Sequence, residues 1–378
     1  MNILIIGDPN SLFVLNYAKN LRELTNSEIQ LDLLGTFRPF RMGDSKAYFR
    51  KTFLLPASAK VYSNMRLQMV LRFFLLGWVL LVRRNQYQVI HCFYAYKDLI
   101  LLRRLFKSWP GRLVLTIYGS DFYTIPQRWR QGYNAFFQYP DRITFANPNT
   151  KATFRKSFQI DEEKLKICRF GLEPLKVLSA MKDVPTSECR RRLSVPTDKI
   201  IIAVGYNFDA IQQHTGILDS LENSADLSAW NDSIFFVFPM TNGQDKENKS
   251  SVLERLKSFR YPFKVFDKFM TNEEISCLRL ATDIMIQVQK SDQLSGSMQE
   301  HLYAGNLIIT GKWLPYDTFV NEGIYFRRVG NVDDLGNELL ESLANLQAEK
   351  AKCKDNPDII FRLSSWEKNI DSWLNLYY

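Results

Sequence analysis

Two acidic residues, Asp292 and Glu300, flank a short Ser-Gly-Ser segment, and they are the residues whose types and spacing most clearly suggest chemistry. The segment Ser295–Ser297 follows an apolar run and precedes a helical pattern, and serine and glycine favour helix capping and close backbone approach. Free N–H groups at such a helix start suit a diphosphate. Glu300 is predicted one turn further on the same face, where a carboxylate could accept hydrogen bonds from two vicinal ribose hydroxyls. An ordinary capped surface helix is the alternative.

The elements that must position this site alternate between short apolar runs and helical patterns. Apolar runs bounded by polar or turn residues are typical of strands buried on both faces of a parallel sheet. We expect strands at 2–6, 30–34, 88–93, 112–118 and 142–146, and a second series at 200–204, 234–238, 263–266, 284–288 and 307–310. The pattern predicts an α/β protein of two doubly wound halves. Facing halves of this kind would place one substrate on each lip of a cleft.

The length of 378 residues fits two domains of moderate size. We expect a first domain at 1–172 and a second at 197–363. The segment 173–196 contains Pro174, Pro185 and Pro196 and a weak periodicity, so it is predicted to be a linker.

The amino-acid composition limits which binding partners and which cellular compartment are expected. Five widely spaced cysteines, without a Cys-x-x-Cys pair, suit a reducing compartment and argue against a structural zinc site. No signal peptide is visible, so a cytoplasmic protein is expected. The net charge of +9 comes without a nucleic-acid-binding motif, so we expect no nucleic acid partner. A basic face toward an anionic membrane and a simple surplus of lysine stay open as explanations.

The most apolar stretch, 67–82, is interrupted by Arg72 and followed by Arg83 and Arg84. The part between Arg72 and Arg83 is far shorter than the roughly 20 residues that a membrane-spanning helix needs. A buried or interfacial helix is therefore predicted, with peripheral membrane association as one interpretation and a core helix as the other.

The stretch from Asp292 to Gly305 resembles the acidic motif of family-four and related bacterial surface-polysaccharide glycosyltransferases. Here Asp replaces the usual first Glu, and Gly296 stands one place later than usual. The resemblance implies the GT-B fold, two facing Rossmann-like domains with an interdomain cleft. It implies that Glu300 binds the ribose and Asp292 the donor sugar at the reaction centre. The diphosphate would meet the turn formed by Ser295, Gly296 and Ser297.

Further segments resemble the same family. The strand 112–117 leads into Tyr118-Gly-Ser-Asp121, where relatives have His-Gly-Ser-Asp, so Tyr118 and Asp121 are candidate catalytic residues; Asp121 as a turn or helix cap is the alternative. Three residues are expected on the acceptor side: Asn10, Ser11 and His91, the last of which fits a core residue equally well. Around the donor diphosphate the resemblance suggests Tyr206, His214, Lys268 and Lys290. The closing segment 364–378 resembles a helix that packs back on the first domain.

We therefore expect a glycosyltransferase that moves a sugar from a nucleotide-diphosphate sugar to an acceptor hydroxyl. The resemblance implies retention of anomeric configuration and a role in surface polysaccharide or glycolipid assembly. The sequence contains no Asp-x-Asp pair, so no metal and no further cofactor is expected. A nucleotide-sugar epimerase or hydrolase, and a non-catalytic sugar-nucleotide-binding module, are the alternatives.

Overall fold

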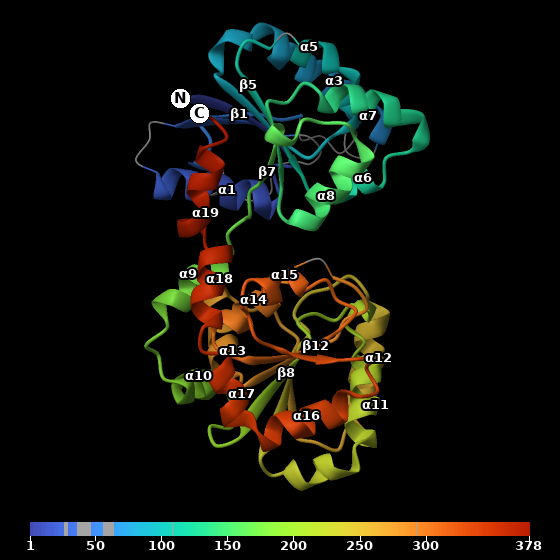
Figure 1. Ribbon diagram of the computed structural model, residues 1–378, viewed down its shortest axis with the longest axis vertical. Coiled ribbons are helices and arrows are strands. Elements are labelled where there is room, and N and C mark those ends of the chain that lie inside the picture. The colour runs from blue at the N-terminus through green and yellow to red at the C-terminus, as the bar shows by residue number, and fades with distance from the viewer. Residues whose placement is uncertain (26–28, 36–46, 56–63, 108, 293) are drawn as a thin grey trace. The chain divides into compact units, whose positions relative to one another are not determined.

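The computed structural model describes residues 1–25, 29–35, 47–55, 64–107, 109–292 and 294–378. The chain forms two compact units, Met1–Gly171 with Trp366–Tyr378, and Leu172–Ser365 (Figure 1). Each unit has its own parallel sheet and its own hydrophobic cores, and each is described by itself below.

The first unit is built on a parallel sheet with the strand order β3-β2-β1-β4-β5-β6-β7. Its strands are rich in Val, Ile and Leu, which suit strands covered on both faces. Their bounds are β1 Asn2–Gly7, β2 Gln30–Gly35, β3 Lys51–Phe53, β4 Val89–Phe93, β5 Arg112–Ile117, β6 Arg142–Phe145 and β7 Leu165–Ile167.

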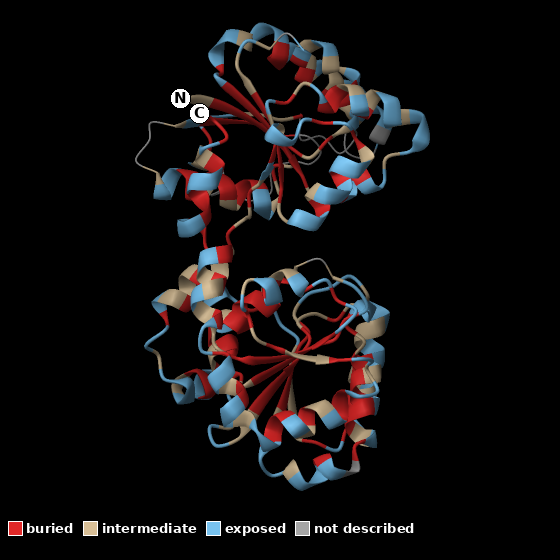
Figure 2. Cartoon of the chain, in the orientation of Figure 1, coloured by how far each residue is buried: buried red, intermediate tan, exposed pale blue. Residues whose placement is uncertain are grey.

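Helices cover this sheet on both faces, and apolar side chains from sheet and helices form two separate clusters. Figure 2 shows the strands buried, whereas the outward faces of many helices are exposed. The helices are α1 Leu12–Leu24, α3 Met65–Val82, α4 Lys97–Leu101, α5 Arg103–Lys107, α6 Ser120–Tyr123, α7 Arg130–Phe137, α8 Pro148–Ser157 and α19 Trp366–Leu374.

The second unit has a parallel sheet of the order β10-β9-β8-β11-β12-β13. The strands are β8 Ile200–Val204, β9 Ile234–Pro239, β10 Phe263–Phe266, β11 Ile284–Gln287, β12 Leu307–Gly311 and β13 Arg327–Val329. The helices are α9 Glu173–Ala180, α10 Thr186–Arg192, α11 His214–Asn223, α12 Lys246–Leu256, α13 Asn272–Ala281, α14 Gly296–Tyr303, α15 Asp317–Asn321, α16 Leu335–Ala344, α17 Leu346–Lys352 and α18 Asn356–Ser364.

Both sheets reverse their strand order at one point, between β1 and β4 in the first unit and between β8 and β11 in the second. The connections on the two sides of such a reversal leave in opposite directions and open a crevice beyond the carboxyl ends of the strands. Ligand sites are therefore expected at these two places.

The end of the chain belongs to the core of the first unit. Helix α19 packs against α1, and Trp366, Ile370 and Trp373 are buried in the cluster that covers one face of the sheet. The hydroxyl of Tyr377 bonds to that of Tyr17 and lies 2.6 Å from Nδ1 of His91.

The predicted fold class is confirmed, since each half is a doubly wound α/β unit. Strands β3, β7 and β13 were not predicted, because runs of three residues are too short to show a period. The linker prediction for 173–196 was wrong. This segment forms α9 and α10, and it buries Leu175, Leu178 and Cys189 in the cores of the second unit. Pro174 and Pro185 stand at the starts of these helices instead of separating domains.

Candidate functional site

At the strand-order reversal of the second sheet, the turn after β8 contains a glycine that no other residue could easily replace. Gly205 follows β8 directly and has φ +62°, a conformation that favours glycine. A Cβ there would lie 2.9 Å from Oε1 of Gln212 and 3.2 Å from Nε2 of His214. The turn after β8 therefore holds His214, the first residue of α11, close to the backbone at the carboxyl end of the sheet.

Three buried polar groups near this reversal have no hydrogen-bond partner among the residues that the structure describes. They are both ring nitrogens of His214, Oε1 of Gln287 at the end of β11, and Oγ of Ser297 in the first turn of α14. Buried polar groups in folded proteins are almost always satisfied, because leaving one unpaired costs about 1–3 kcal/mol. Their gathering where two neighbouring strands and two helices begin or end is typical of a site for a polar ligand.

Helix α14 begins as the sequence predicts. The side chain of Ser295 accepts a hydrogen bond from the backbone N–H of Met298, at 3.2 Å, and Gly296 and Ser297 form the first turn. The free N–H groups and the dipole of this helix start give it an affinity for anions. The glycine leaves room, since a Cβ on Gly296 would meet nothing closer than 3.6 Å.

Glu300 is buried and forms an ion pair that the sequence did not reveal. Nε of Arg279, in α13, donates to Oε2 of Glu300 at 3.0 Å, and Nη2 lies 3.0 Å from the same oxygen. Burial raises the pKa of Glu300, whereas the neighbouring guanidinium lowers it. The other carboxylate oxygen, Oε1, lies 4.0 Å from the position of a Cβ on Gly296, so it is on the side of the first turn of α14.

The same network extends through His301 and Asn306. Nη1 of Arg279 lies 3.0 Å from Nε2 of His301, and Asn306 lies 2.8 Å from the other ring nitrogen. Burial and the nearby guanidinium hold the pKa of His301 well below its usual value, so the ring is neutral. These contacts fix the orientation of the side chains behind Glu300.

Asp292 lies in a group of polar and aromatic side chains at the end of β11. The hydroxyl of Tyr316 donates to Asp292, and the amide of Gln287 lies 3.5 Å from the same hydroxyl. Tyr206 is half-buried beside Gln212 and Gln289, and burial, with the nearby Asp292 carboxylate, raises its pKa. The structure thus brings together Asp292, Tyr206 and the reversal point, and adds Gln287 and Tyr316, which sequence reasoning missed.

The two candidate cations are placed differently. Lys290 is exposed just after β11, and its backbone N–H bonds to Ile211 in the turn that leads to His214. Lys268 is exposed after β10, which is the edge strand, with β9 between that strand and β8. By this geometry Lys290 is the cation closer to the turn that holds His214.

In the first unit, the turn after β1 and the end of β5 lie close together. Asn10 and Ser11 follow β1, and the side chain of Ser11 neighbours the Tyr118 hydroxyl. The Tyr118 ring packs 5.3 Å from that of Phe13, and burial raises the pKa of Tyr118 well above its usual value. Tyr118 is therefore a neutral aromatic group at the carboxyl edge of the first sheet.

Asp121 links the segments that follow β4 and β5. Its carboxylate accepts hydrogen bonds from the backbone N–H groups of Tyr118, Gly119 and Ala95, at 3.1, 2.9 and 3.1 Å. Burial raises the pKa of Asp121 to about 6, against the opposing effect of these hydrogen bonds. Both oxygens are thus engaged in holding turns, the role that the sequence left open as an alternative.

A cavity of about 360 Å³ lies at the same edge of the sheet and includes Asp121 in its wall. Three tyrosines line it, two from the turn after β4 and one from α7, and Tyr94 has φ 99°, a strained conformation for a side chain of this size. Aromatic faces beside a carboxylate and a cation suit an amphipathic ring-shaped ligand. The lining residues are Tyr94, Ala95, Tyr96, Lys97, Asp121, Thr124, Ile125, Pro126 and Tyr133.

The acceptor-side prediction for His91 was wrong. His91 lies inside β4, is fully buried, and bonds to Tyr377 and to Thr116, the latter at 2.8 Å. Burial lowers its pKa to about 3. It is a core residue that joins the sheet to the end of the chain.

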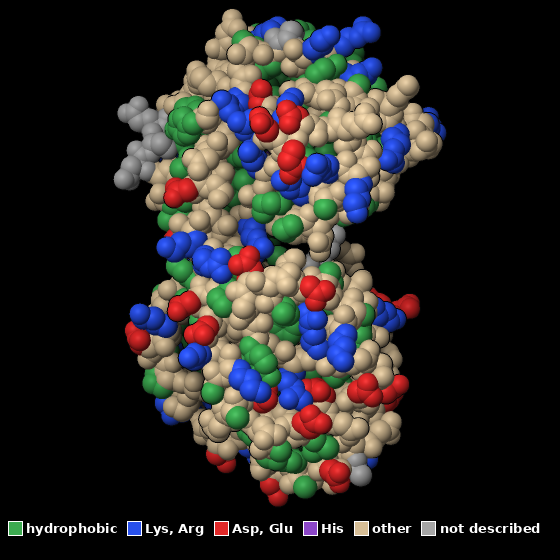
Figure 3. Space-filling model, in the orientation of Figure 1, with side chains coloured by type: hydrophobic (Ala, Val, Ile, Leu, Met, Phe, Trp, Pro, Cys, Tyr) green, Lys and Arg blue, Asp and Glu red, His purple; other side chains and the backbone are tan. Residues whose placement is uncertain are grey.

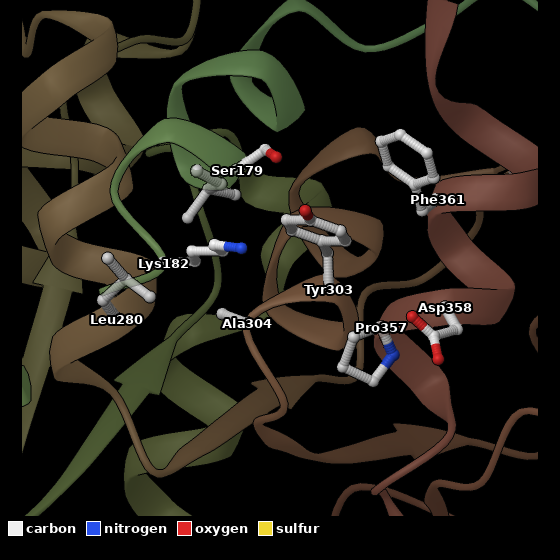
Figure 4. A pocket seen from close by; sticks show the side chains of 9 residues that line it. Ser179, Lys182, Leu280, Tyr303, Ala304, Pro357, Asp358 and Phe361 are labelled. Carbon is white, nitrogen blue, oxygen red and sulfur yellow. The ribbon is translucent and has the colours of Figure 1, made fainter. Parts of the chain in front are cut away.

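Another cavity, of about 470 Å³, lies in the second unit away from the start of α14 (Figure 4). Its wall contains Tyr303 and Ala304, at the carboxyl end of that helix, together with Lys182 and Asp358. A helix carboxyl end presents carbonyl groups and disfavours anions. The start of α14 is therefore better placed than this cavity to hold an anion.

The burial of His214 predicts a pH dependence of stability. Desolvation lowers its pKa to about 4, below the unfolded value of about 6.5. Between these values the unfolded chain binds more protons, so the free energy of unfolding falls as the pH falls through this window, by roughly 3 kcal/mol in total. Urea unfolding at pH 7 and pH 4.5 should show a smaller loss for His214→Leu than for the parent. Equal losses would contradict the assignment.

The fold defines a class: both units have the architecture found in the GT-B glycosyltransferases, and solved structures with this fold align with the whole chain. A glycosyltransferase from Rickettsia africae aligns at 14% identity with a TM-score of 0.76, covering 100% of this chain and 97% of that one. Sucrose-phosphate synthase from Thermosynechococcus elongatus aligns at 14% identity and a TM-score of 0.70, covering 100% and 98%. HepE from Anabaena, in complex with UDP-glucose, aligns at 14% identity and a TM-score of 0.67, covering 99% of each chain.

Residues 2–147 match the family described as glycosyl transferase 4-like. The match falls within the first unit and covers less than half of the chain. No curated protein sequence matches. The resemblance to family-four glycosyltransferases, which the sequence motifs suggested, is thus confirmed, and so is the predicted GT-B fold.

Proposed function

We propose that this protein is a glycosyltransferase that moves a sugar from a nucleotide-diphosphate sugar to an acceptor hydroxyl. The observation that carries the proposal is the set of unpaired buried groups, on His214, Gln287 and Ser297, beside the start of α14. A nucleotide-diphosphate sugar has a diphosphate that could bind at the start of α14. It also has ribose and sugar hydroxyls that could donate hydrogen bonds to Glu300 and Asp292. The UDP complexes of the similar HepE structures favour UDP as the nucleotide.

In this proposal the second unit binds the donor. The amides of Gly296 and Ser297 stabilise the departing diphosphate, and Lys290 adds a positive charge. Glu300 binds the ribose through the oxygen that Arg279 does not use. Asp292, oriented by Tyr316, contacts the donor sugar. The backbone N–H groups at the start of α14 would stabilise the negative charge of the diphosphate, so the proposed transfer needs no metal ion.

The aromatic cavity of the first unit is proposed to bind the acceptor sugar. Tyr94 and Tyr96 offer ring faces, and Asp121, with its turn contacts, positions the edge of the cavity nearest Tyr118. An acceptor of this kind fits surface polysaccharide or glycolipid assembly. Tyr96→Ala should raise the acceptor KM several-fold, because an aromatic contact contributes about 0.5–1.5 kcal/mol, and should leave UDP affinity unchanged.

Nucleotide binding tests the donor half of the proposal. UDP, GDP, ADP and TDP are compared at equal concentration by thermal unfolding. At about 100-fold excess over Kd the bound nucleotide should stabilise by ~2.7 kcal/mol, and UDP should do so most strongly. No stabilisation by any of the four would refute the proposed donor site.

Product analysis tests the reaction. Incubation with UDP-sugars and glycan acceptors should give a transferred sugar with its anomeric configuration retained, and the rate should persist in excess EDTA. UDP release without an acceptor would instead indicate a hydrolase, and nucleotide binding without any turnover would indicate a binding module. Loss of activity in EDTA that Mg²⁺ or Mn²⁺ restores would refute metal independence.

The substitution Gly296→Ala is expected to reduce nucleotide binding without destabilising the fold. In the free protein the added Cβ meets only ordinary contacts, with Leu172 at 3.6 Å and Glu300 at 4.0 Å. We expect the free energy of unfolding to change by less than about 1 kcal/mol, because alanine favours the helix. UDP affinity should fall at least tenfold, because the methyl group occupies the place of the diphosphate. Calorimetry with UDP measures this, and unchanged affinity would remove Gly296 from the site.

A further inference from the structure

A second cavity of the first unit is lined almost wholly by polar side chains. It has a volume of about 630 Å³, within the range of cavities that hold small ligands. Its wall comes from the short helix η3 (Gln127–Trp129), from the first half of α7, and from the end of α8 with the residues that follow it. We call it the polar groove, and its lining residues are Gln127, Arg128, Arg130, Gln131, Asn134, Ser157, Phe158 and Gln159.

The polar groove and the aromatic cavity share one segment of wall. Residues 124–126 line the aromatic cavity, and the next residues in the chain, Gln127 and Arg128, line the polar groove. In α7 the neighbours Tyr133 and Asn134 likewise line one cavity each. A ligand longer than one sugar ring is therefore able to extend from the aromatic cavity into the polar groove.

The amide side chains of the groove suit a sugar chain. Gln127, Gln131 and Asn134 are exposed, and each amide offers N–H donors and a carbonyl acceptor. Sugar hydroxyl groups also donate and accept, so an amide can bind them in either direction. A ligand that only accepts hydrogen bonds, such as a phosphate ion, would use only the donors of these groups. The lining therefore favours a ligand with many hydroxyl groups.

The groove also carries positive charge. Arg128 is exposed. Arg130 is held in place, because its Nη2 donates to the carbonyl oxygen of Ser157 at 3.3 Å and its guanidinium lies 5.3 Å from the centre of the Phe158 ring. None of the described residues that line the groove is acidic. The planar guanidinium of arginine matches a carboxylate, to which it can donate two parallel hydrogen bonds.

The charge of the surrounding segment has the same sign. Residues 122–159 contain six Lys and Arg and a single acidic residue, Asp141, and so carry a net charge of +5. The carboxylate of Asp141 accepts a backbone hydrogen bond from the second residue of β5. Glu162, just beyond the segment, is paired with Lys151 and Arg155. Figure 3 shows Lys and Arg side chains over α7 and α8. The ligand that fits this groove is therefore negatively charged.

We propose that the polar groove binds an acidic oligosaccharide, with Arg128 and Arg130 on its carboxylates and the amides on its hydroxyl groups. The inference rests on the proposed function, in which the aromatic cavity holds the acceptor sugar. The terminal sugar of the acceptor lies in that cavity, and the sugars behind it lie in the groove. The acceptor is thus a chain of several sugars that contains uronic acid units.

Anionic lipid is another source of negatively charged groups. In the described part of the chain no helix is long and apolar enough to cross a membrane. The exposed apolar side chains of α3, such as Phe74 and Trp78, lie outside the groove, and Phe158 within it is buried. Binding to a lipid surface gains from apolar side chains that enter the acyl region, and the described lining of the groove exposes none. A sugar chain therefore fits the groove better.

Calorimetric titration of the full chain, without any donor, tests the proposal. Tetragalacturonic acid should bind, and its methyl ester, which has the same sugars without the charge, should bind about fivefold more weakly. Affinity for the acid should fall as salt rises, and affinity for the ester should not. Equal affinity for the two, or no binding of the acid, overturns the proposal. Full displacement of the acid by an equal concentration of inorganic phosphate, or by phosphatidylglycerol vesicles, overturns it as well.

Variants at exposed positions assign the contacts. Arg128→Gln should weaken binding of the acid about two- to fivefold and leave binding of the ester nearly unchanged, because an ion pair is lost. Gln131→Ala with Asn134→Ala should weaken acid and ester alike, by about fivefold, because contacts to hydroxyl groups are lost. Lys107→Gln, on α5 and outside both cavities, is the control for charge and should change neither affinity. Equal losses for Arg128→Gln and Lys107→Gln overturn the assignment.

The measurements separate this inference from the proposed function. UDP affinity should be unchanged in every variant, because the candidate donor site lies in the second unit. If the acid does not bind, while UDP binds and sugar is transferred to a neutral acceptor, this inference alone fails. If the acid binds with the expected selectivity and no nucleotide binds, the groove remains a glycan site and the proposed function fails.

Discussion

Replacing Arg279 with Met should lower the free energy of unfolding of the second unit by about 3–5 kcal/mol, because it leaves the buried carboxylate of Glu300 without its cation. The guanidinium of Arg279 is almost wholly buried, donates a hydrogen bond to Glu300 and forms an ion pair with it. It also reaches His301, which would lose its partner on Nε2. Urea unfolding of parent and variant measures the difference.

The pH dependence of this loss identifies its cause. Burial already raises the pKa of Glu300, and removal of Arg279 takes away the opposing effect. A carboxyl whose folded pKa is raised becomes less destabilising as the pH falls and it binds a proton. The deficit of Arg279→Met should therefore be smaller at pH 5 than at pH 8. A deficit that is independent of pH would indicate lost packing.

The surface supplies a matched control. Arg362 pairs with Glu322 at 3.0 Å, but both side chains are substantially exposed. Arg362→Met should change the free energy of unfolding by no more than about 1 kcal/mol, because exposed ion pairs contribute little. Comparable losses for the two arginine variants would contradict the importance assigned to the buried pair.

Replacing Glu300 with Gln should reduce UDP affinity by about 10- to 150-fold, the loss expected when hydrogen bonds to a charged group lose that charge. The amide keeps the size of the side chain, so the site stays in place. The variant also weakens the pair with Arg279, and some destabilisation accompanies the loss. Calorimetric titration of UDP, at a temperature where the variant is folded, gives the affinity.

The nucleotide itself provides the decisive control. If Glu300 binds the ribose hydroxyls, then 2′,3′-dideoxy-UDP should bind parent and Glu300→Gln with nearly equal affinity, because the interacting groups are already missing. A loss of the same size for UDP and for the dideoxy compound would place Glu300 outside the ribose site. Glu322→Gln, at a partly exposed position outside the candidate site, should alter neither affinity.

Local features of the candidate donor site were predictable from the sequence. Ser295, Gly296 and Glu300 lie within six consecutive residues, so capping and spacing rules apply directly. Arg279 was not predictable as the partner of Glu300, because it lies on another helix within a pattern typical of any amphipathic segment. Gln287 likewise ends an apolar strand, and nothing in its sequence neighbourhood distinguishes it from a polar residue that simply closes the strand.

Long-range contacts account for the remaining differences. His91 stands in a strand-end segment that suggests a site, and its role depends on Tyr377, 286 residues away. The prolines of 173–196 suggest a linker, whereas the decision between linker and helix rests on packing against α13 and α14. For α3 the apolar pattern was visible, but a sequence cannot say which face the fold leaves uncovered.

The placement of α19 has a consequence for how the two units fold. Tyr17 and Tyr377 are 360 residues apart, and Trp366 and Trp373 complete a core that α1 covers only in part. The second unit takes all its strands and core clusters from the continuous segment 172–365, whereas the first unit joins residues 1–171 to the distant segment 366–378. Contacts between residues far apart in the sequence form slowly, because the entropy of closing a long loop is lost before the contact is gained. The core of the first unit is therefore expected to be completed later than that of the second.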